Sequence, residues 1–352
     1  MHLLRSRRDG RLARPVERSS TKPPHTHPPC HSESALAHTQ APKGHKNTAQ
    51  GVSPGVSSRG KPLPAWAPIT FHPNVLRRKC AEINPFDPPR IDCYRPMNLQ
   101  CKPALAASYK SRSQIARILT EDWCARELYC AACSSNALSR TKTNAQTVDF
   151  FCPQCAQPYQ LKSRLNAYTS KITDAAYEPM IRAIREDRTP NLLFLQYSNN
   201  WAVSNLLLVP RFFFSESVIE KRNPLGPGAR RAGWVGCNIL LGNIVPDGRI
   251  SVVSNGIALP SKDVRRRFAE MRALSGVPPE TRGWTLDMLR IVWEIGKENF
   301  TLSEAYEYAD ELQALHPHNQ HVRPKIRQQL QILRDLGFLR FVAPGQYAVI
   351  KH

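Results

Sequence analysis

The sequence contains no run of about 18 apolar residues, which is the length that a membrane-spanning helix needs. Its basic start, Met1–Arg18, also lacks the apolar stretch of about 7 to 15 residues that a secretory signal requires. We therefore expect an intracellular protein without a membrane partner. In that compartment the ten cysteines are expected to be thiols or metal ligands and not disulfides.

Acidic residues are scarce, because 28 Asp and Glu stand against 49 Lys and Arg, which gives a formal net charge of +21. Such an excess predicts a polyanionic partner, since each cation that replaces a counterion at a phosphate adds salt-dependent affinity. Nucleic acid is the first candidate. An anionic membrane surface is the second, but only the net charge favours it, since no basic amphipathic helix with a large apolar face is present.

Residues 1–96 lack both helical and strand periodicity, and they hold 15 of the 30 prolines and 7 of the 11 histidines. They carry 16 basic and 6 acidic residues, so +10 of the +21 lies here. Too little apolar surface is available to offset the entropy of ordering this segment. We predict a disordered basic Pro/His-rich extension over 1–96. Either it is an arm that adds non-specific DNA affinity, or it is an upstream extension of the reading frame with Met97 as the true start.

From Met97 onward, the periodicity of apolar residues predicts regular structure. The pattern predicts helices over 109–127 and 173–188, and strands over 147–152, 159–163, 191–197 and 201–209, with the last two buried around an Asn199-Asn200 turn. This mixture predicts an α/β domain over 97–276. Glu121, Tyr177 and Tyr197 are expected to have packing or surface roles.

A linker at 276–279 separates this domain from a basic unit over 280–352. Amphipathic helices are predicted over 284–295, 302–315 and 322–336, followed by a hairpin of 338–342 and 347–350. Thr301 is the expected N-cap of the second helix, with Glu304 completing a capping box. Three helices and a hairpin are the layout of a winged helix, whose third helix contacts the DNA major groove.

Two cysteine pairs form the most specific motif in the chain. Cys130 and Cys133 are separated by two residues, as are Cys152 and Cys155, and 18 residues lie between the pairs. This spacing is typical of a four-thiolate zinc site, which is structural because no position remains open for water or substrate. The other cysteines have no such partners and are expected to be free thiols.

Asp149, Gln160 and Lys162 form a weaker pattern around the second cysteine pair. Gln160 and Lys162 lie on one face of a strand, and Asp149 on a neighbouring strand projects toward them if Cys152–Cys155 is the turn of a hairpin. Oxygen ligands suit Mg²⁺, and a lysine can orient or deprotonate the attacking water in phosphodiester hydrolysis. Alone the pattern has little specificity, because such residues recur by chance in any basic protein.

Several longer segments closely resemble the DpnI-like, Dam-replacing family of methyl-directed restriction endonucleases. They are 109–123, Asp149–Cys152, Leu161–Ser163, Ala229–Trp234 and Lys325–Gln331. The resemblance runs almost collinearly from Met97 to the C-terminus. It implies a PD-(D/E)xK nuclease core with an inserted zinc site, joined to a C-terminal winged helix.

The resemblance further implies a type II endonuclease that cuts both strands of double-stranded DNA at adenine-methylated GATC with catalytic Mg²⁺. Asp149, Gln160 and Lys162 match the catalytic positions, with Asp149 and Gln160 holding the magnesium ion. Gln160 departs from the pattern, which has Asp or Glu there, so we expect weaker Mg²⁺ binding. The alternative is a catalytically inactive regulator that binds methyl-adenine DNA.

Two segments are expected to contact DNA. The resemblance places Trp234 in a methyl-adenine pocket, where a flat apolar ring suits a methyl group, while a core tryptophan is the alternative. Arg230 and Arg231 beside it are expected to bind phosphates. In the third helix of the winged helix and just before it, the candidates are Asn319, Gln320, His321, Arg323, Lys325 and Arg327. By analogy the protein is expected to be monomeric, cytoplasmic and bacterial, and associated with the nucleoid through DNA.

Overall fold

The computed structural model of this chain describes residues 96–141, 147–165 and 170–350. The predicted extension over 1–96 therefore lies outside the described residues apart from Pro96, as do Cys30, Cys80 and Cys93. Within the described part of the chain, every helix is too short or too polar to cross a lipid bilayer.

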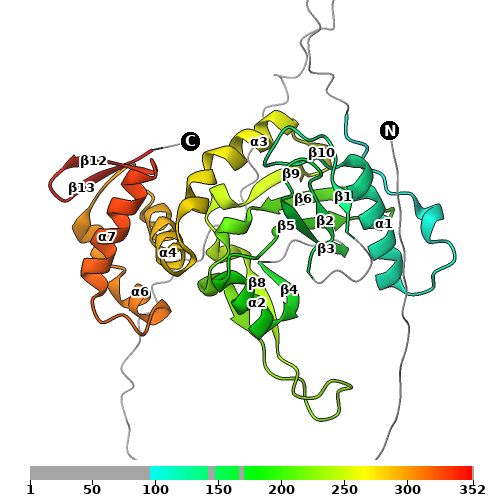
Figure 1. Ribbon diagram of the computed structural model, residues 1–352, viewed down its shortest axis with the longest axis horizontal. Coiled ribbons are helices and arrows are strands. Elements are labelled where there is room, and N and C mark those ends of the chain that lie inside the picture. Colours follow the sequence, from blue (N-terminus) through cyan, green and yellow to red (C-terminus); the bar gives the residue numbers. More distant parts are fainter. Residues whose placement is uncertain (1–95, 142–146, 166–169, 351–352) are drawn as a thin grey trace, which may run out of the picture. The chain divides into compact units, whose positions relative to one another are not determined.

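A mixed seven-stranded sheet forms the centre of the larger part (Figure 1). Its strand order is β1 (Ser139–Arg140), β2 (Phe150–Phe151), β3 (Pro158–Leu165), β5 (Asn191–Tyr197), β6 (Val203–Val209), β9 (Ile250–Ser254) and β10 (Ile257–Ala258). Only the β3–β5 pair in this sheet is parallel. Every residue of β5 is buried, as its apolar sequence predicts.

Two helices flank this sheet. α1 (Arg112–Glu127) contacts β3, and α3 (Ser261–Glu270) contacts β9. α1 buries Leu119 and Trp123 completely, and the Trp123 indole N–H donates to the Asn98 carbonyl at 2.7 Å. α1 begins at Arg112 and not at Tyr109 as predicted, because Ser111 has extended backbone angles.

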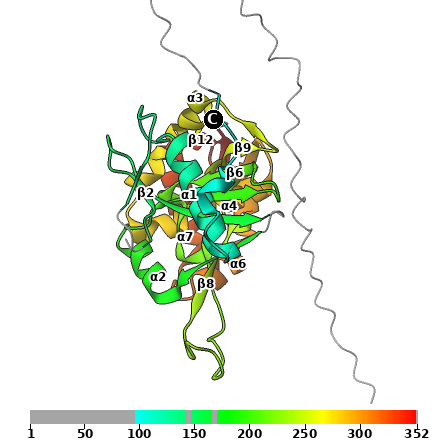
Figure 2. The same ribbon diagram turned by 90° about the vertical axis from the view of Figure 1, so that its right-hand side faces the viewer.

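A second, three-stranded sheet has the order β4 (Lys171–Ala176), β8 (Gly236–Leu240) and β7 (Ile219–Lys221). β4 corrects the predicted helix over 173–188, because residues 173–176 are strand and only α2 (Tyr177–Arg185) is helical. Pairing of Ile172 with Ile239 of β8 outweighs the local helical pattern. The connection from β7 to β8 extends away from both sheets as a long loop (Figures 1 and 2).

The C-terminal part is a winged helix. It contains α4 (Pro279–Ile295), β11 (Asn299–Thr301), α5 (Leu302–Tyr306), α6 (Ala309–Leu315), α7 (Val322–Asp335), β12 (Leu339–Ala343) and β13 (Gln346–Val349). The Thr301–Glu304 capping box is confirmed. The predicted helix over 302–315 is interrupted between α5 and α6, and β11 adds an unpredicted third strand beside β13. Trp284, Leu289, Ile326, Leu330 and Leu333 pack in its core.

Short 3-10 helices complete the described structure. They are η2 (Pro103–Ala106), η3 (Arg211–Phe213), η4 (Glu216–Val218), η5 (Leu241–Asn243), η6 (Pro246–Gly248) and η7 (Arg272–Gly276).

Candidate functional site

The two cysteine pairs converge on one point. One Sγ atom from each of Cys130, Cys133, Cys152 and Cys155 lies within 4.8 Å of the other three. The first pair follows α1, and the second pair lies in the turn between β2 and β3. Four sulfurs gathered in this way are the donor set of a closed tetrahedral zinc site.

Hydrogen-bond donors point at these sulfurs. The backbone N–H of Ala132 donates to Cys130 Sγ at 3.3 Å, and that of Cys155 donates to Cys152 Sγ at 3.4 Å. Burial raises the pKa of the Cys152 thiol, but hydrogen bonds from the N–H groups of Cys155 and Gln154 and from neighbouring thiols lower it by more. The net result is a pKa lowered to about 6. At Cys152 the surroundings therefore favour thiolate, which is the form that binds zinc.

The remaining described cysteines behave as predicted. Cys101, Cys124 and Cys237 are buried and form no disulfide. Burial raises the pKa of Cys101 and of Cys237 to about 11. Such protonated, buried thiols pack as small apolar side chains.

The second cysteine pair does lie in the turn of a hairpin, which was the condition for Asp149 to project toward Gln160 and Lys162. Phe150 pairs with Tyr159 and Phe151 with Pro158, and the Cys152 N–H donates to the Gln157 carbonyl at 2.9 Å to close the turn. Beyond the paired residues, the Leu161 N–H donates to Asp149 Oδ2 at 2.7 Å. This bond holds the Asp149 carboxylate against β3, one residue from Gln160 and Lys162.

The neighbours of Asp149 shift the pKa of its carboxyl group in opposite directions. Burial raises its pKa, the Leu161 N–H lowers it, the charge of Glu121 raises it, and Lys162 and Arg117 lower it. The net direction is upward, so the site disfavours the bare anion. A bound cation would reverse this shift, since an opposite charge stabilises the ionised form.

Gln160 and Lys162 do point to the same side of β3, and there they meet Asp174. The Gln160 amide nitrogen donates to Asp174 Oδ1 at 3.2 Å, and the Lys162 ammonium forms an ion pair with the same oxygen. Gln160 is buried, whereas the Lys162 side chain is 27% exposed. Asp174, Gln160 and Lys162 thus form one cluster between two sheets, and Asp149 is held on the intervening residue Leu161 of β3.

Asp174 was missed by the sequence analysis. It lies on β4 of the second sheet, within a segment that was predicted to be helical. The pairing register of β4 with β8 shifts between Thr173 and Ala176, which is a β-bulge at Asp174. Bulges redirect side chains and are common beside active sites, but no local motif marks this one in the sequence.

The loop between β7 and β8 carries Trp234, Arg230 and Arg231. Both arginines are exposed, and Trp234 is half-buried at the base of the loop and lies outside the hydrophobic core. The Arg231 guanidinium lies 4.9 Å from the centroid of the Trp234 ring. A Cβ atom at Gly236 would lie only 2.7 Å from that ring, so the ring packs directly on the backbone at the start of β8.

The residues singled out around the third helix lie at the N-terminal end of α7. Gln320, His321, Arg323 and Arg327 are exposed, and Lys325 is half-buried. Asn319 shapes the turn, because its Oδ1 accepts from the His321 N–H at 2.7 Å. The Arg323 and Arg327 guanidinium groups lie 5.3 and 5.7 Å from the Tyr306 ring centroid. An open hollow beside them is lined in part by Gln320, His321 and Lys325.

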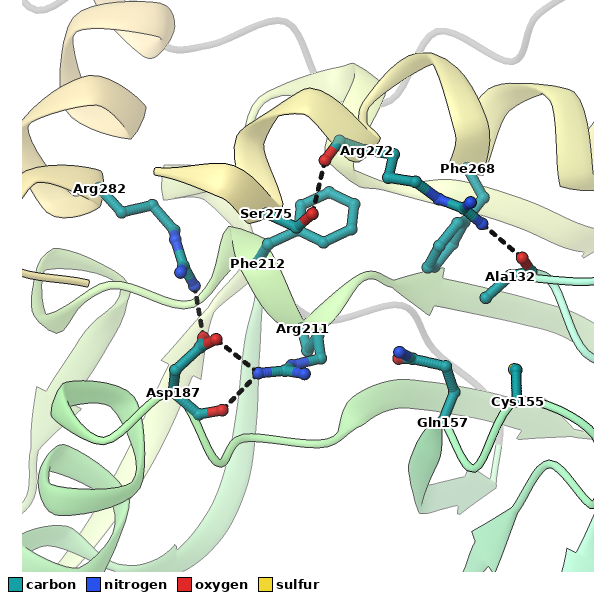
Figure 3. Close-up of a pocket in the computed structure, with 10 residues that line it drawn as sticks. All are labelled: Ala132, Cys155, Gln157, Asp187, Arg211, Phe212, Phe268, Arg272, Ser275 and Arg282. Atoms are coloured by element: carbon teal, nitrogen blue, oxygen red, sulfur yellow. Dashed lines mark hydrogen bonds and ion pairs between the residues drawn. The ribbon is translucent and has the colours of Figure 1, made fainter. Parts of the chain in front are cut away.

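A separate pocket of about 400 Å³ lies next to the cysteine cluster (Figure 3). The Asp187 carboxylate forms ion pairs with Arg211 at 2.7 Å and with Arg282 at 2.6 Å, and Arg272 donates to the Ala132 carbonyl. Arg282 belongs to α4, whereas Asp187 follows α2. These arginines contact protein groups, so the pocket joins segments of the chain that lie far apart in sequence.

The chain matches two protein-family models. Residues 97–277 match DpnI, the Dam-replacing family, and residues 280–349 match the Dam-replacing HTH domain. The first match alone covers just over half of the chain. The protein belongs to the Dam-replacing family.

Within this member of the Dam-replacing family, the first match includes the cysteine cluster, Asp149, Asp174 and the Trp234 loop, and the second includes α4 to α7. Family membership supports a methylation-dependent restriction enzyme with a DNA-binding HTH domain. The four-cysteine cluster, for its part, is compatible with a zinc ion.

Proposed function

We propose that this chain is a type II restriction endonuclease that cleaves double-stranded DNA at adenine-methylated GATC by Mg²⁺-assisted phosphodiester hydrolysis. Residues 97–276 are its PD-(D/E)xK nuclease domain, and residues 280–352 are a second DNA-binding domain. The observation that carries the proposal is the gathering of Asp149, Gln160 and Lys162 at the β2–β3 hairpin, inside a chain of the Dam-replacing family.

The donor set at this hairpin fits a magnesium ion. Asp149 and Gln160 would hold it through a carboxylate and an amide oxygen, which are hard ligands. When bound, Mg²⁺ stabilises the negative charge that develops on the phosphate. The raised pKa of Asp149 supports this assignment, because a buried carboxylate without a cation is disfavoured.

Lys162 is the proposed group that handles the attacking water. Its ammonium is partly exposed while its ion pair with Asp174 fixes its direction. From that position the side chain orients a water molecule toward the phosphate and helps to neutralise the phosphate charge. Asp149, in turn, is fixed by the Leu161 N–H and keeps its remaining oxygen lone pairs for the ion.

Recognition is proposed to use two surfaces. Trp234 contacts the adenine methyl group by apolar contact, and Arg230 and Arg231 bind phosphates around it. At the HTH domain, the residues around the start of α7 contact bases and phosphates; they are Asn319, Gln320, His321, Arg323, Lys325 and Arg327. The exposure of most of these side chains supports this assignment.

Gln160 favours a second candidate function, that of an inactive regulator which binds methylated DNA. An amide carries no charge, so the three matched positions alone bind Mg²⁺ less strongly than two carboxylates would. Lys162 two residues later argues against a decayed site, because its side chain is held in place by an ion pair.

One experiment separates the two functions. The protein is incubated with Mg²⁺ and a plasmid from a host that methylates GATC adenines, and with the same plasmid from a host that does not. We expect cutting of the methylated plasmid alone. Retardation of the methylated plasmid without cutting, in Mg²⁺ and in Mn²⁺, would establish the regulator.

Two variants assign the roles in this assay. Asp149→Ala is expected to lower the cutting rate at least about 1000-fold and to leave retardation unchanged, because a ligand of the ion is lost. Trp234→Ala is expected to reduce the preference for methylated DNA by about fivefold, which is roughly 1 kcal/mol of apolar contact. Trp293→Ala, at an exposed position on α4, is the matched control and should change neither.

A further inference from the structure

Asp174 is a buried carboxylate at the centre of the site that the matched positions leave without a role. Its side chain is 0% exposed, although it belongs to β4 and not to the sheet that carries Gln160 and Lys162. From β4 its side chain reaches β3, where it contacts Gln160 and Lys162. A carboxylate in such a place needs compensation, because burying an unpaired charge is costly.

The two oxygens of Asp174 have unequal partners. Oδ1 accepts from the Gln160 amide and from the Lys162 ammonium. Oδ2 is buried and has no hydrogen-bond partner among the described residues. A buried oxygen with unused lone pairs beside two proposed site residues is suited to a cation.

The charge of the site leads to the same conclusion. The usual set of two acids and one lysine has a net charge of −1, whereas Asp149, Gln160 and Lys162 sum to zero. Asp174 returns the sum to −1. Asp174 also contacts both Gln160 and Lys162. Its negative charge therefore lies beside position 160, where an amide replaces the usual acid.

We propose that Asp174 is the second carboxylate ligand of the magnesium ion and binds it through Oδ2. It replaces the Asp or Glu that the usual pattern has at position 160. This inference rests on the proposed function, because it takes the ion at Asp149 as given. Gln160 then has two tasks, since its amide nitrogen holds Asp174 while its amide oxygen faces the ion. A glutamate at position 160 would instead place two negatively charged carboxylates next to each other in the metal-free protein, where they would repel.

The test measures metal binding directly. Mn²⁺ is titrated into the zinc-loaded full chain without DNA, and heat release is followed by calorimetry. Asp174→Asn keeps the shape of the side chain and removes its charge, so we expect affinity to fall at least about tenfold. In Asp174→Asn/Gln160→Glu the acid moves to position 160, and we expect affinity to return to within about threefold of wild type. A merely structural role for Asp174 would not produce this rescue.

Two results would overturn the inference. One is unchanged Mn²⁺ affinity in Asp174→Asn while Asp149→Ala loses binding; the other is a double variant that binds no more tightly than Asp174→Asn. If either occurs while wild type still cuts methylated plasmid, the proposed function stands and Asp174 is not a ligand. If wild type binds Mn²⁺ with the expected variant pattern but never cuts, the proposed function fails and the ligand assignment stands.

A second measurement covers the case in which Asp174→Asn does not fold, which thermal melting would show. Fe²⁺ is bound to the wild-type protein in place of Mg²⁺, and ascorbate and peroxide are then added. Radicals form at the bound iron and cleave the chain close to it. We expect cuts near residues 149, 160 and 174 that excess Mg²⁺ suppresses. Cuts near 149 and 160 without any near 174 would contradict the assignment.

Discussion

Glu121 influences Asp149 although the two side chains come from different elements. The charge of Glu121, on α1, raises the pKa of the Asp149 carboxyl, and Arg117, which Glu121 binds at 2.7 Å, lowers it. The sequence favours a packing or surface role for Glu121. In the folded protein the charge of this residue also raises the pKa of the carboxyl that is proposed to hold the ion.

Glu121→Gln is therefore expected to shift the acid side of the cutting rate profile to lower pH. Cutting needs ionised Asp149, and it is lost as pH falls through the raised pKa of that carboxyl. Removing the negative charge of Glu121 lowers this pKa, so activity persists further into acid. The measurement is the initial cutting rate of methylated plasmid against pH.

Asp122→Asn is the matched control for this shift. Asp122 is an acid on the same helix, but it binds Arg126 at 2.7 Å. Its removal should leave the acid side of the profile in place. An unchanged profile in Glu121→Gln would remove Glu121 from the electrostatics of the site.

At the scale of elements, the limits of sequence analysis are clearest around β4. The position of Gln160 and Lys162 on one face of a strand follows from strand periodicity and was predicted. The hairpin that brings Asp149 toward them was a condition of that prediction, and the structure meets it. Asp174 could not be found in this way, because the bulge that aims it arises from pairing between β4 and β8, which are far apart in sequence. The local periodicity of residues 173–176 predicts a helix, but pairing with β8 makes these residues a strand.

The winged helix shows the same contrast. Its Thr301 capping box follows from a local pattern and agrees with the structure. β11 does not, because its three residues become a strand only by pairing with β13 at the far end of the chain. A three-residue segment has too little periodicity of its own to be recognised.

The cysteine pairs are expected to act as one structural unit. Cys133→Ser should abolish zinc binding and lower stability by several kcal/mol, since loss of a structural zinc ion typically removes much of the folding free energy of its surroundings. Zinc content by elemental analysis and the melting temperature measure both effects. Cys101→Ser removes a buried thiol outside the cluster and should keep the zinc ion.

For the molecule as a whole, the positive charge divides into unequal parts. Residues 1–96 contribute +10 of the +21, and the family matches begin at residue 97. A variant that starts at Met97 is expected to cut methylated plasmid at the wild-type rate. Its affinity for unmethylated DNA should fall and depend less steeply on salt, because fewer phosphate counterions are displaced.

Titration of labelled DNA at several salt concentrations measures that slope. Loss of cutting in the shorter variant would show that the extension takes part in catalysis. An unchanged slope would show that its charge does not contact DNA at all.

The small β4–β8–β7 sheet has a kinetic consequence. Gly236, on which the Trp234 ring packs, pairs with Ala176, two residues after Asp174, and the Tyr177 N–H donates to the Val235 carbonyl at 3.1 Å. On the proposed assignments, Trp234 contacts the methyl group and Asp174 binds the ion. Both residues are attached to neighbouring positions of this one hydrogen-bonded sheet. Discrimination would then appear in the turnover of bound DNA as well as in its affinity, so an unmethylated site could be occupied and still remain uncut.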